Sequence, residues 1–154
     1  MSRPMSPEYA STREVREVMA EEETYGSFRL SCRRPDRDLM VVTIIGDLDL
    51  QSVAQTQAFL RHATARSPRH LIIDMSQVSF LSSSGISLLI GVGSGHSGRN
   101  SAPLQLRTIP TRLHLVGARE NPHVARPLAL LGLLDHFATA DDLDDLVARL
   151  LEQL

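Results

Sequence analysis

The longest apolar run of the chain predicts a central strand. Residues 39–45 are apolar or β-branched with no polar alternation, a pattern typical of a strand that is buried on both faces. A second run at residues 71–73 indicates another buried strand, which we expect to end at Asp74 and to lead into a connector. Weaker strand signals fall at residues 28–32, 104–109, 113–116 and 136–138.

Helices are expected between and after these strands. Residues 51–65 carry apolar side chains at helical spacing, and Pro68 follows soon after them. Asn121 followed by Pro122 is typical of a helix start, and Gly132 of a helix end. Aspartates crowd the first turn of a last helix, where the helix dipole favours them. Its apolar face, which we expect to dock on the sheet, comprises Leu143, Leu146, Val147, Leu150 and Leu154.

The order of these elements predicts the fold class. A helix between two strands implies a parallel pair with a right-handed crossover. We therefore expect a single α/β domain over residues 27–154, with a mixed sheet of four or five strands and helices packed mainly on one side. Residues 33–38 are rich in turn-forming residues and predict a turn. Residues 1–26 are expected to be an extension, either disordered or a short helix, with a solvated acidic run at residues 21–23.

Glycines crowd the segment after the second buried strand and its helix. Four of them between residues 91 and 98 are expected to end that helix early, since each costs about 1 kcal/mol inside a helix. Gly93, Gly95 and Gly98 match the spacing of a dinucleotide-binding loop, but they do not follow a strand and open a helix, as that loop requires. We favour a Gly-rich loop over residues 91–111 and keep nucleotide binding as a minor alternative.

Composition narrows the function classes. The net charge of −2 gives no basic surface for nucleic acid, and no apolar run suits a membrane span or a signal peptide. The single cysteine, Cys32, fits a reducing cytoplasm. All sixteen basic residues are arginine, which excludes lysine chemistry. The six histidines do not pair at the spacings of a zinc site, so we expect no metal and no cofactor.

The candidate chemistry centres on three serines before an apolar helix, Ser82, Ser83 and Ser84. A hydroxyl at a helix start accepts hydrogen bonds from the first turn, so capping alone is one explanation. Phosphorylation is a second, because it adds about −1.5 to −2 charges at the positive end of the helix dipole and disrupts a partner docked there. Ser83 as a hydrolytic nucleophile is a third, although the surrounding residues do not form G-x-S-x-G.

Two aspartates follow the central strand. Gly46 permits a backbone turn, and Asp49 is placed to cap the next helix. Paired acids two residues apart are compatible with metal or acid–base chemistry, but neither a histidine nor a third carboxylate lies near them in sequence. We favour a place for Asp47 and Asp49 on the same partner-facing rim as the serines.

The serine stretch resembles the STAS domain of bacterial anti-sigma factor antagonists. That family has an apolar strand ending in aspartate, then phenylalanine, an apolar residue, Asp-Ser-Ser-Gly or Asp-Ser-Thr-Gly, and an apolar helix. Two further motifs match in the expected order, at residues 46–49 and 121–133. Ser82 departs from the pattern, since it stands where the family usually has aspartate. The residues that match around it are Asp74, Phe80, Leu81, Ser83, Ser84 and Gly85.

The resemblance implies a protein–protein switch and not an enzyme. The unmodified domain would bind an anti-sigma factor of the kinase type and so release a sigma factor, and phosphorylation of Ser83 would abolish binding. The implied partners are this anti-sigma factor, which is also the serine kinase, and a phosphoserine phosphatase; the protein itself is expected to be a monomer or weak dimer. An interaction module without phosphoregulation stays open, because Ser82 replaces the usual aspartate. The expected partner-binding residues are Asp47, Asp49, Ser82, Ser83, Ser84 and Gly85, with Gly85 letting a partner backbone approach.

Overall fold

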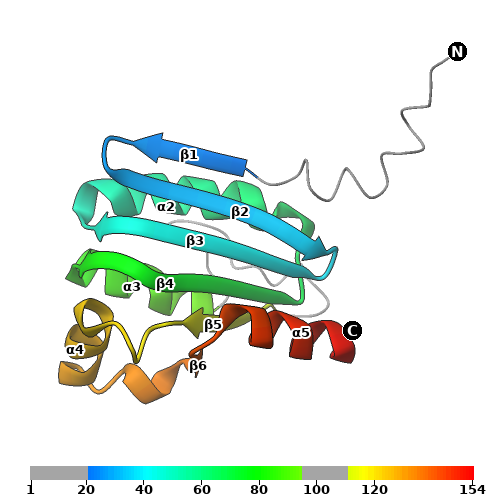
Figure 1. The fold of residues 1–154 in the computed structure, drawn as a ribbon. Helices are drawn as coiled ribbons and strands as arrows, with labels where there is room; N and C mark the ends of the chain where they lie inside the picture. The colour runs from blue at the N-terminus through cyan, green and yellow to red at the C-terminus, as the bar shows by residue number, and fades with distance from the viewer. Residues whose placement is uncertain (1–20, 95–110) are drawn as a thin grey trace, which may run out of the picture.

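Six strands form one sheet and lie side by side in the order in which they occur along the chain. The strands are β1 (Glu21–Tyr25), β2 (Phe28–Asp36), β3 (Leu39–Leu48), β4 (His70–Leu81), β5 (Arg112–Val116) and β6 (Ala138–Ala140). The computed structural model describes residues 21–94 and 111–154 (Figure 1). Strands β1 to β3 pair antiparallel, and β3 to β6 run parallel. The mixed α/β sheet is confirmed, with six strands where four or five are expected from the sequence.

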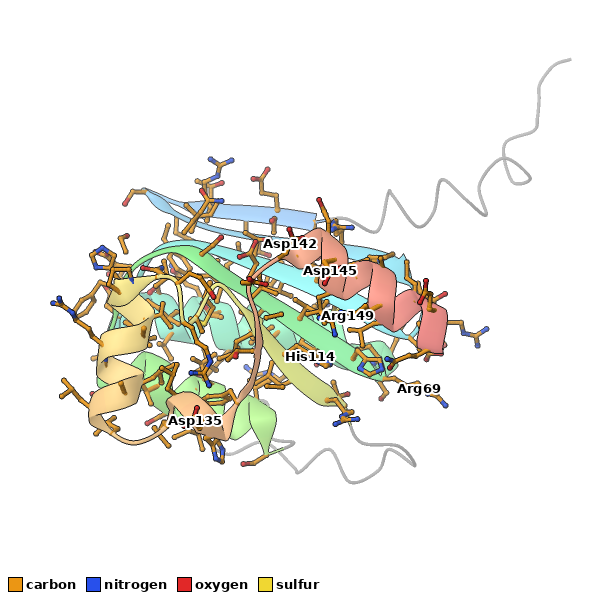
Figure 2. All side chains as sticks on the ribbon, turned by 60° about the horizontal axis from the view of Figure 1, so that its bottom comes forward. Arg69, His114, Asp135, Asp142, Asp145 and Arg149 are labelled. Carbon is orange, nitrogen blue, oxygen red and sulfur yellow. The ribbon has the colours of Figure 1, made fainter. Side chains whose placement is uncertain are left out.

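Three of the described helices cover one face of the sheet and a fourth covers the other. Helices α2 (Leu50–Ala63), α3 (Ser83–Gly93) and α4 (Pro122–Leu130) share one apolar core with the sheet. Helix α5 (Leu143–Gln153) crosses the opposite face (Figure 2). It buries Leu146, Val147 and Leu150 against the sheet, with Leu143 partly buried, which confirms the predicted docking of its apolar face for these residues. Leu154, predicted on the same face, is 40% exposed at the end of the chain. None of the described helices is long and apolar enough to cross a membrane.

Strand β1 replaces part of the expected N-terminal extension. The acidic residues of this segment pair with β2, and a tight turn at Gly26, whose φ is +64°, joins the two strands. All but the first of its five side chains are exposed, so the strand has no apolar pattern for sequence reasoning to detect. The rest of the predicted extension lies outside the described residues.

The turn after β2 is shorter than predicted. Strand β2 runs through Pro35 to Asp36, and only residues 37 and 38 form the turn. A register shift between Arg33 and Asp36 interrupts the pairing with β3 around the proline, which has no N–H to donate. The Asp36 carboxylate accepts from the Asp38 N–H at 2.9 Å and closes the turn.

Strand β4 continues through the predicted connector to Leu81. Its pairing with β3 shifts register between Asp74 and Gln77, and again between Val78 and Phe80, so each shift adds one unpaired residue to β4. At the first shift, Asp74 Oδ1 accepts from the N–H of Ser76 at 3.0 Å and from its hydroxyl at 2.7 Å. Asp74 therefore stabilises a bulge and does not end the strand.

Two later predictions need correction, and two lie outside the described residues. Helix α3 continues to Gly93 despite its glycines, because its apolar residues Ile86, Leu88 and Leu89 are buried in the core against the sheet. The segment predicted as a strand at residues 136–138 instead has a 3-10 turn ending at His136, followed by β6. The predicted strand at residues 104–109 and the remaining glycines of the Gly-rich loop are not described. Helix α4 begins at Pro122 and ends before Gly132, as predicted.

Candidate partner-binding site

The serine segment and the two aspartates meet at one end of the sheet. Strands β3 and β4 are parallel neighbours, with Asp47 paired to Phe80 and Leu48 paired to Leu81. Helices α2 and α3 begin directly after these strands and pack against each other. Their N-termini therefore lie together at the carboxyl ends of β3 and β4 (Figure 1), where irregular strand ends commonly carry binding residues.

Ser82 caps helix α3. Its hydroxyl accepts from the N–H of Gly85 at 3.1 Å and donates to the carbonyl of Leu48 at 2.9 Å. The Ser82 N–H also donates to the Leu48 carbonyl, at 3.0 Å. An aspartate at this position would offer the same acceptor to the first turn, so the serine keeps the cap that the usual aspartate provides.

Ser83 is left free by this cap. It is the first residue of α3, its side chain is exposed, and its hydroxyl hydrogen-bonds to no side chain or backbone group among the described residues. Capping therefore explains Ser82 but not Ser83. No described histidine or carboxylate is bonded to the Ser83 hydroxyl, so the structure offers no paired base of the kind that activates a serine nucleophile. Ser84, the next residue, is half-buried.

The two aspartates have different roles. Asp49 caps α2: its carboxylate accepts from the N–H of Ser52 at 3.0 Å, and its own N–H donates to the Ser52 hydroxyl at 2.9 Å. Hydrogen bonds from Ser52 hold the pKa of Asp49 below its usual value. Asp47 is exposed and accepts from the Ser79 hydroxyl at 3.0 Å. Within residues 21–94 and 111–154, no three histidine, cysteine or acidic side chains gather where a metal ion could bind.

Gly85 is buried, which differs from the role expected from the sequence. A side chain at this position would place its Cβ 2.8 Å from Leu81 Cδ1 and 3.1 Å from both Cγ and O of Leu48. The close approach that needs a glycine is thus made within the chain, between α3 and the end of β3. A partner backbone does not account for it.

Two exposed apolar side chains lie at the same end of the sheet as the free serine, and the sequence analysis did not identify them as surface residues. Leu50 is 75% exposed at the start of α2, and Phe80 is 50% exposed near the end of β4. Both would be expected inside a core by residue type alone. We call these exposed residues at one end of the sheet, Asp47, Leu50, Phe80 and Ser83, the serine rim. Exposed apolar side chains near polar ones are typical of protein-binding surfaces.

The family model of the STAS domain matches residues 31–94, which include β3, α2, β4 and the serine rim. This part of the chain is similar to a STAS domain. The match covers the part of the chain in which the strand, serine cap and helix follow one another. No curated protein matches the chain.

Solved proteins with this fold include two anti-sigma factor antagonists. One, from Mycobacterium paratuberculosis, has 22% identity and a TM-score of 0.54, with 85% of this chain and 92% of that chain covered. Unphosphorylated SpoIIAA has 21% identity and a TM-score of 0.61, with 82% and 97% covered; the Bacillus protein has also been solved in its phosphorylated form. A serine-to-glutamate variant of RsbS from Moorella thermoacetica has 25% identity and a TM-score of 0.56, with 88% and 97% covered. The first two likenesses establish the fold.

Asn121 connects α4 to the bulged half of β4. Its carbonyl oxygen caps α4 by accepting from the N–H of His123 at 3.0 Å. Its buried amide donates to the carbonyls of Met75 at 2.9 Å and Val78 at 2.8 Å. The sequence predicted the cap, but the bonds to β4 depend on bulges that the sequence did not reveal.

Two histidines meet at the other end of the sheet. Nδ1 of His70 lies 3.1 Å from Nε2 of His114 on the neighbouring strand. Burial lowers the pKa of His114 to about 4 and also lowers the pKa of His70, and the nearby charge of Arg112 adds to both shifts. Both rings are therefore neutral near pH 7, and one donates to the other. Their positive surroundings make this pair a poor site for a metal cation.

Ser82→Ala is expected to lower the free energy of unfolding by about 1 kcal/mol, since it removes the cap of α3. Ser82→Asp restores an acceptor for the first turn but cannot donate to the Leu48 carbonyl as the hydroxyl does, so it is expected to recover only part of that loss. Urea unfolding measures both, with Ser87→Ala, an exposed serine later in the same helix, as the matched control. A Ser82→Asp protein no more stable than Ser82→Ala would contradict the capping role.

Proposed function

We propose that this protein is an anti-sigma factor antagonist, which binds an anti-sigma factor of the kinase type through the serine rim and so releases a sigma factor. The observation that carries the proposal is Ser83, an exposed hydroxyl that the cap of α3 does not use. The similarity to a STAS domain and the shared fold with anti-sigma factor antagonists support it. A STAS domain of this kind acts by binding and not by catalysis.

The composition of the serine rim suits a regulated protein contact. Leu50 and Phe80 provide exposed apolar area, and Asp47 and Ser83 provide exposed polar groups at the same end of the sheet. Association buries the apolar side chains and removes water from the serine hydroxyl. Ser82 and Gly85 contribute indirectly, because they fix the start of α3 against β3.

Phosphorylation of Ser83 is proposed to end this binding without unfolding the domain. The N–H groups at the start of α3 and the helix dipole accommodate a phosphate at this position. Ser83 is exposed, so the phosphate stays hydrated in the free protein. In the complex it would place close to two negative charges in a contact with little water, which is strongly unfavourable unless the partner supplies a countercharge. A phosphoserine phosphatase would restore binding.

Affinity capture from the organism's own cells, followed by a kinase reaction, tests both parts. Tagged protein is expected to retain an anti-sigma factor with an ATP-binding kinase domain. Incubation of the purified pair with ATP is expected to add the mass of one phosphate to the wild-type protein and to Ser87→Ala, but not to Ser83→Ala. Intact-mass spectrometry reads the result.

The replacement of the usual aspartate by Ser82 makes one outcome especially informative. If the anti-sigma factor binds but adds no phosphate, the protein is an antagonist without phosphoregulation. If the purified anti-sigma factor does not bind at all, the proposed function is wrong. The two measurements therefore separate partner choice from its regulation.

A further inference from the structure

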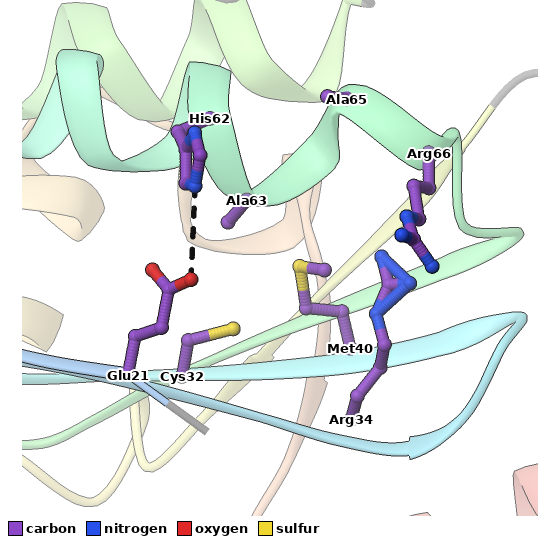
Figure 3. Close-up of a pocket in the computed structure, with 8 residues that line it drawn as sticks. All are labelled: Glu21, Cys32, Arg34, Met40, His62, Ala63, Ala65 and Arg66. Carbon is purple, nitrogen blue, oxygen red and sulfur yellow. Dashed lines mark ion pairs between the residues drawn. The ribbon is translucent and has the colours of Figure 1, made fainter. Parts of the chain in front are cut away.

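A pocket of about 190 Å³ opens at the end of α2 that is farther from the serine rim (Figure 3). Met40 of β3 and Ala63 of α2 form part of its wall. Arg34 of β2 and Arg66 of the 3-10 turn after α2 extend their guanidinium groups toward each other across it (Figure 3). The pocket therefore combines an apolar wall with two positive charges.

Arg34 is the unusual member of this group. It follows the inward-facing residues Phe28, Leu30 and Cys32 at alternate positions along β2, and only 8% of it is exposed. A guanidinium carries five N–H donors and stays charged in proteins. No hydrogen bond or ion pair joins the Arg34 guanidinium to any residue within 21–94 or 111–154. A buried cation without a partner is unfavourable.

The charge of Arg66 adds to that of Arg34 in the pocket. Burial lowers the pKa of Arg34, and the proximity of Arg66 lowers it further. The acidic residue that lines the pocket, Glu21, lies 3.6 Å from His62 (Figure 3). No carboxylate among the described residues forms an ion pair with Arg34 or Arg66, so an incoming anion would meet both guanidinium groups.

We propose that this pocket binds a small organic anion, with its carboxylate between Arg34 and Arg66 and a short apolar body against Met40 and Ala63. A carboxylate accepts paired hydrogen bonds from guanidinium groups and supplies the missing negative charge. The pocket is smaller than the roughly 300 Å³ at which sites for drug-sized ligands begin, so the ligand is a short-chain acid. The site lies apart from the serine rim and does not depend on the proposed partner.

Titration of the full chain with sodium butyrate at constant ionic strength tests the proposal. Calorimetry is expected to show saturable binding, and Arg34→Met and Arg66→Met are each expected to weaken it at least about tenfold. Arg33→Met changes an exposed arginine on the same strand and is expected to bind butyrate like the wild type. Acetate, which lacks the apolar body, and inorganic phosphate are expected to bind more weakly than butyrate.

The melting temperature gives an independent readout. Arg34→Met removes a buried unpaired charge and is expected to melt at the same temperature as the ligand-free wild type or higher, so a loss of binding cannot be attributed to misfolding. Butyrate is expected to raise the melting temperature of the wild type and of Arg33→Met only. Equal butyrate affinity in wild type and Arg34→Met, tighter binding of phosphate than of butyrate, or no saturable binding overturns the proposal.

Discussion

Replacing Ser83 with glutamate is expected to weaken binding of the anti-sigma factor by about 100-fold or more, because a carboxylate is placed in a contact that excludes water. Ser83→Ala removes only a hydroxyl that has no partner within the described chain, so its affinity is expected to stay within about threefold of the wild type. Isothermal titration calorimetry with the purified partner measures both.

A control variant tests whether the loss of affinity in Ser83→Glu depends on the position of the charge or on the added charge alone. Ala148→Glu adds the same charge at an exposed position of α5 on the opposite face of the sheet, and its affinity is expected to match the wild type. Circular dichroism is expected to show the same fold for all three variants, since Ser83 is exposed at the first residue of a helix. Equal affinities for Ser83→Ala and Ser83→Glu would rule out the switch.

Much of the fold could be predicted because burial leaves a simple pattern in most elements. The central strand is a continuous apolar run, and the docking face of α5 repeats apolar residues at helical spacing. Strand β4 does not show a simple burial pattern of this kind. Its two register shifts produce buried residues at Met75, Val78 and Leu81 with two exposed residues between each pair, a spacing of three that indicates neither a strand nor a long helix.

The same irregularity explains what the sequence could not reveal about the site. The motif placed Ser82 and Ser83 together, but capping geometry was needed to show that Ser82 uses its hydroxyl and Ser83 does not. Exposure of Phe80 follows from the second bulge, and exposure of Leu50 follows from its position at the helix start. Residue type alone assigns both to the core, so the apolar part of the rim depends on tertiary structure.

Arg34 shows a related limit. Pro35 and nearby aspartates favour a turn, so the sequence predicted that this residue lies in a turn, and arginine is rarely buried. The strand continues instead, and its alternation directs Arg34 to the same face as Leu30 and Cys32. A charged residue in an inward register is visible only after the strand is known to extend that far.

The second large effect is expected at Asn121. Asn121→Ala removes the cap of α4 and leaves the buried carbonyls of Met75 and Val78 without their donor. The loss of the cap costs about 1 kcal/mol, and the loss of the buried hydrogen bonds costs a further 1–3 kcal/mol or so. We therefore expect the free energy of unfolding to fall by about 3 kcal/mol, measured by urea denaturation.

Asn121→Asp separates the two contributions. Aspartate still accepts from the His123 N–H and keeps the cap, but its carboxylate faces two carbonyl oxygens to which the amide donated. It is expected to be destabilised at least as much as Asn121→Ala, while His123→Ala, at the exposed neighbouring position, is expected to stay near the wild type. If Asn121→Asp unfolds at the wild-type urea concentration, the amide does not hold β4. In that case the packing of α4 alone positions the strand that carries Phe80 to the serine rim.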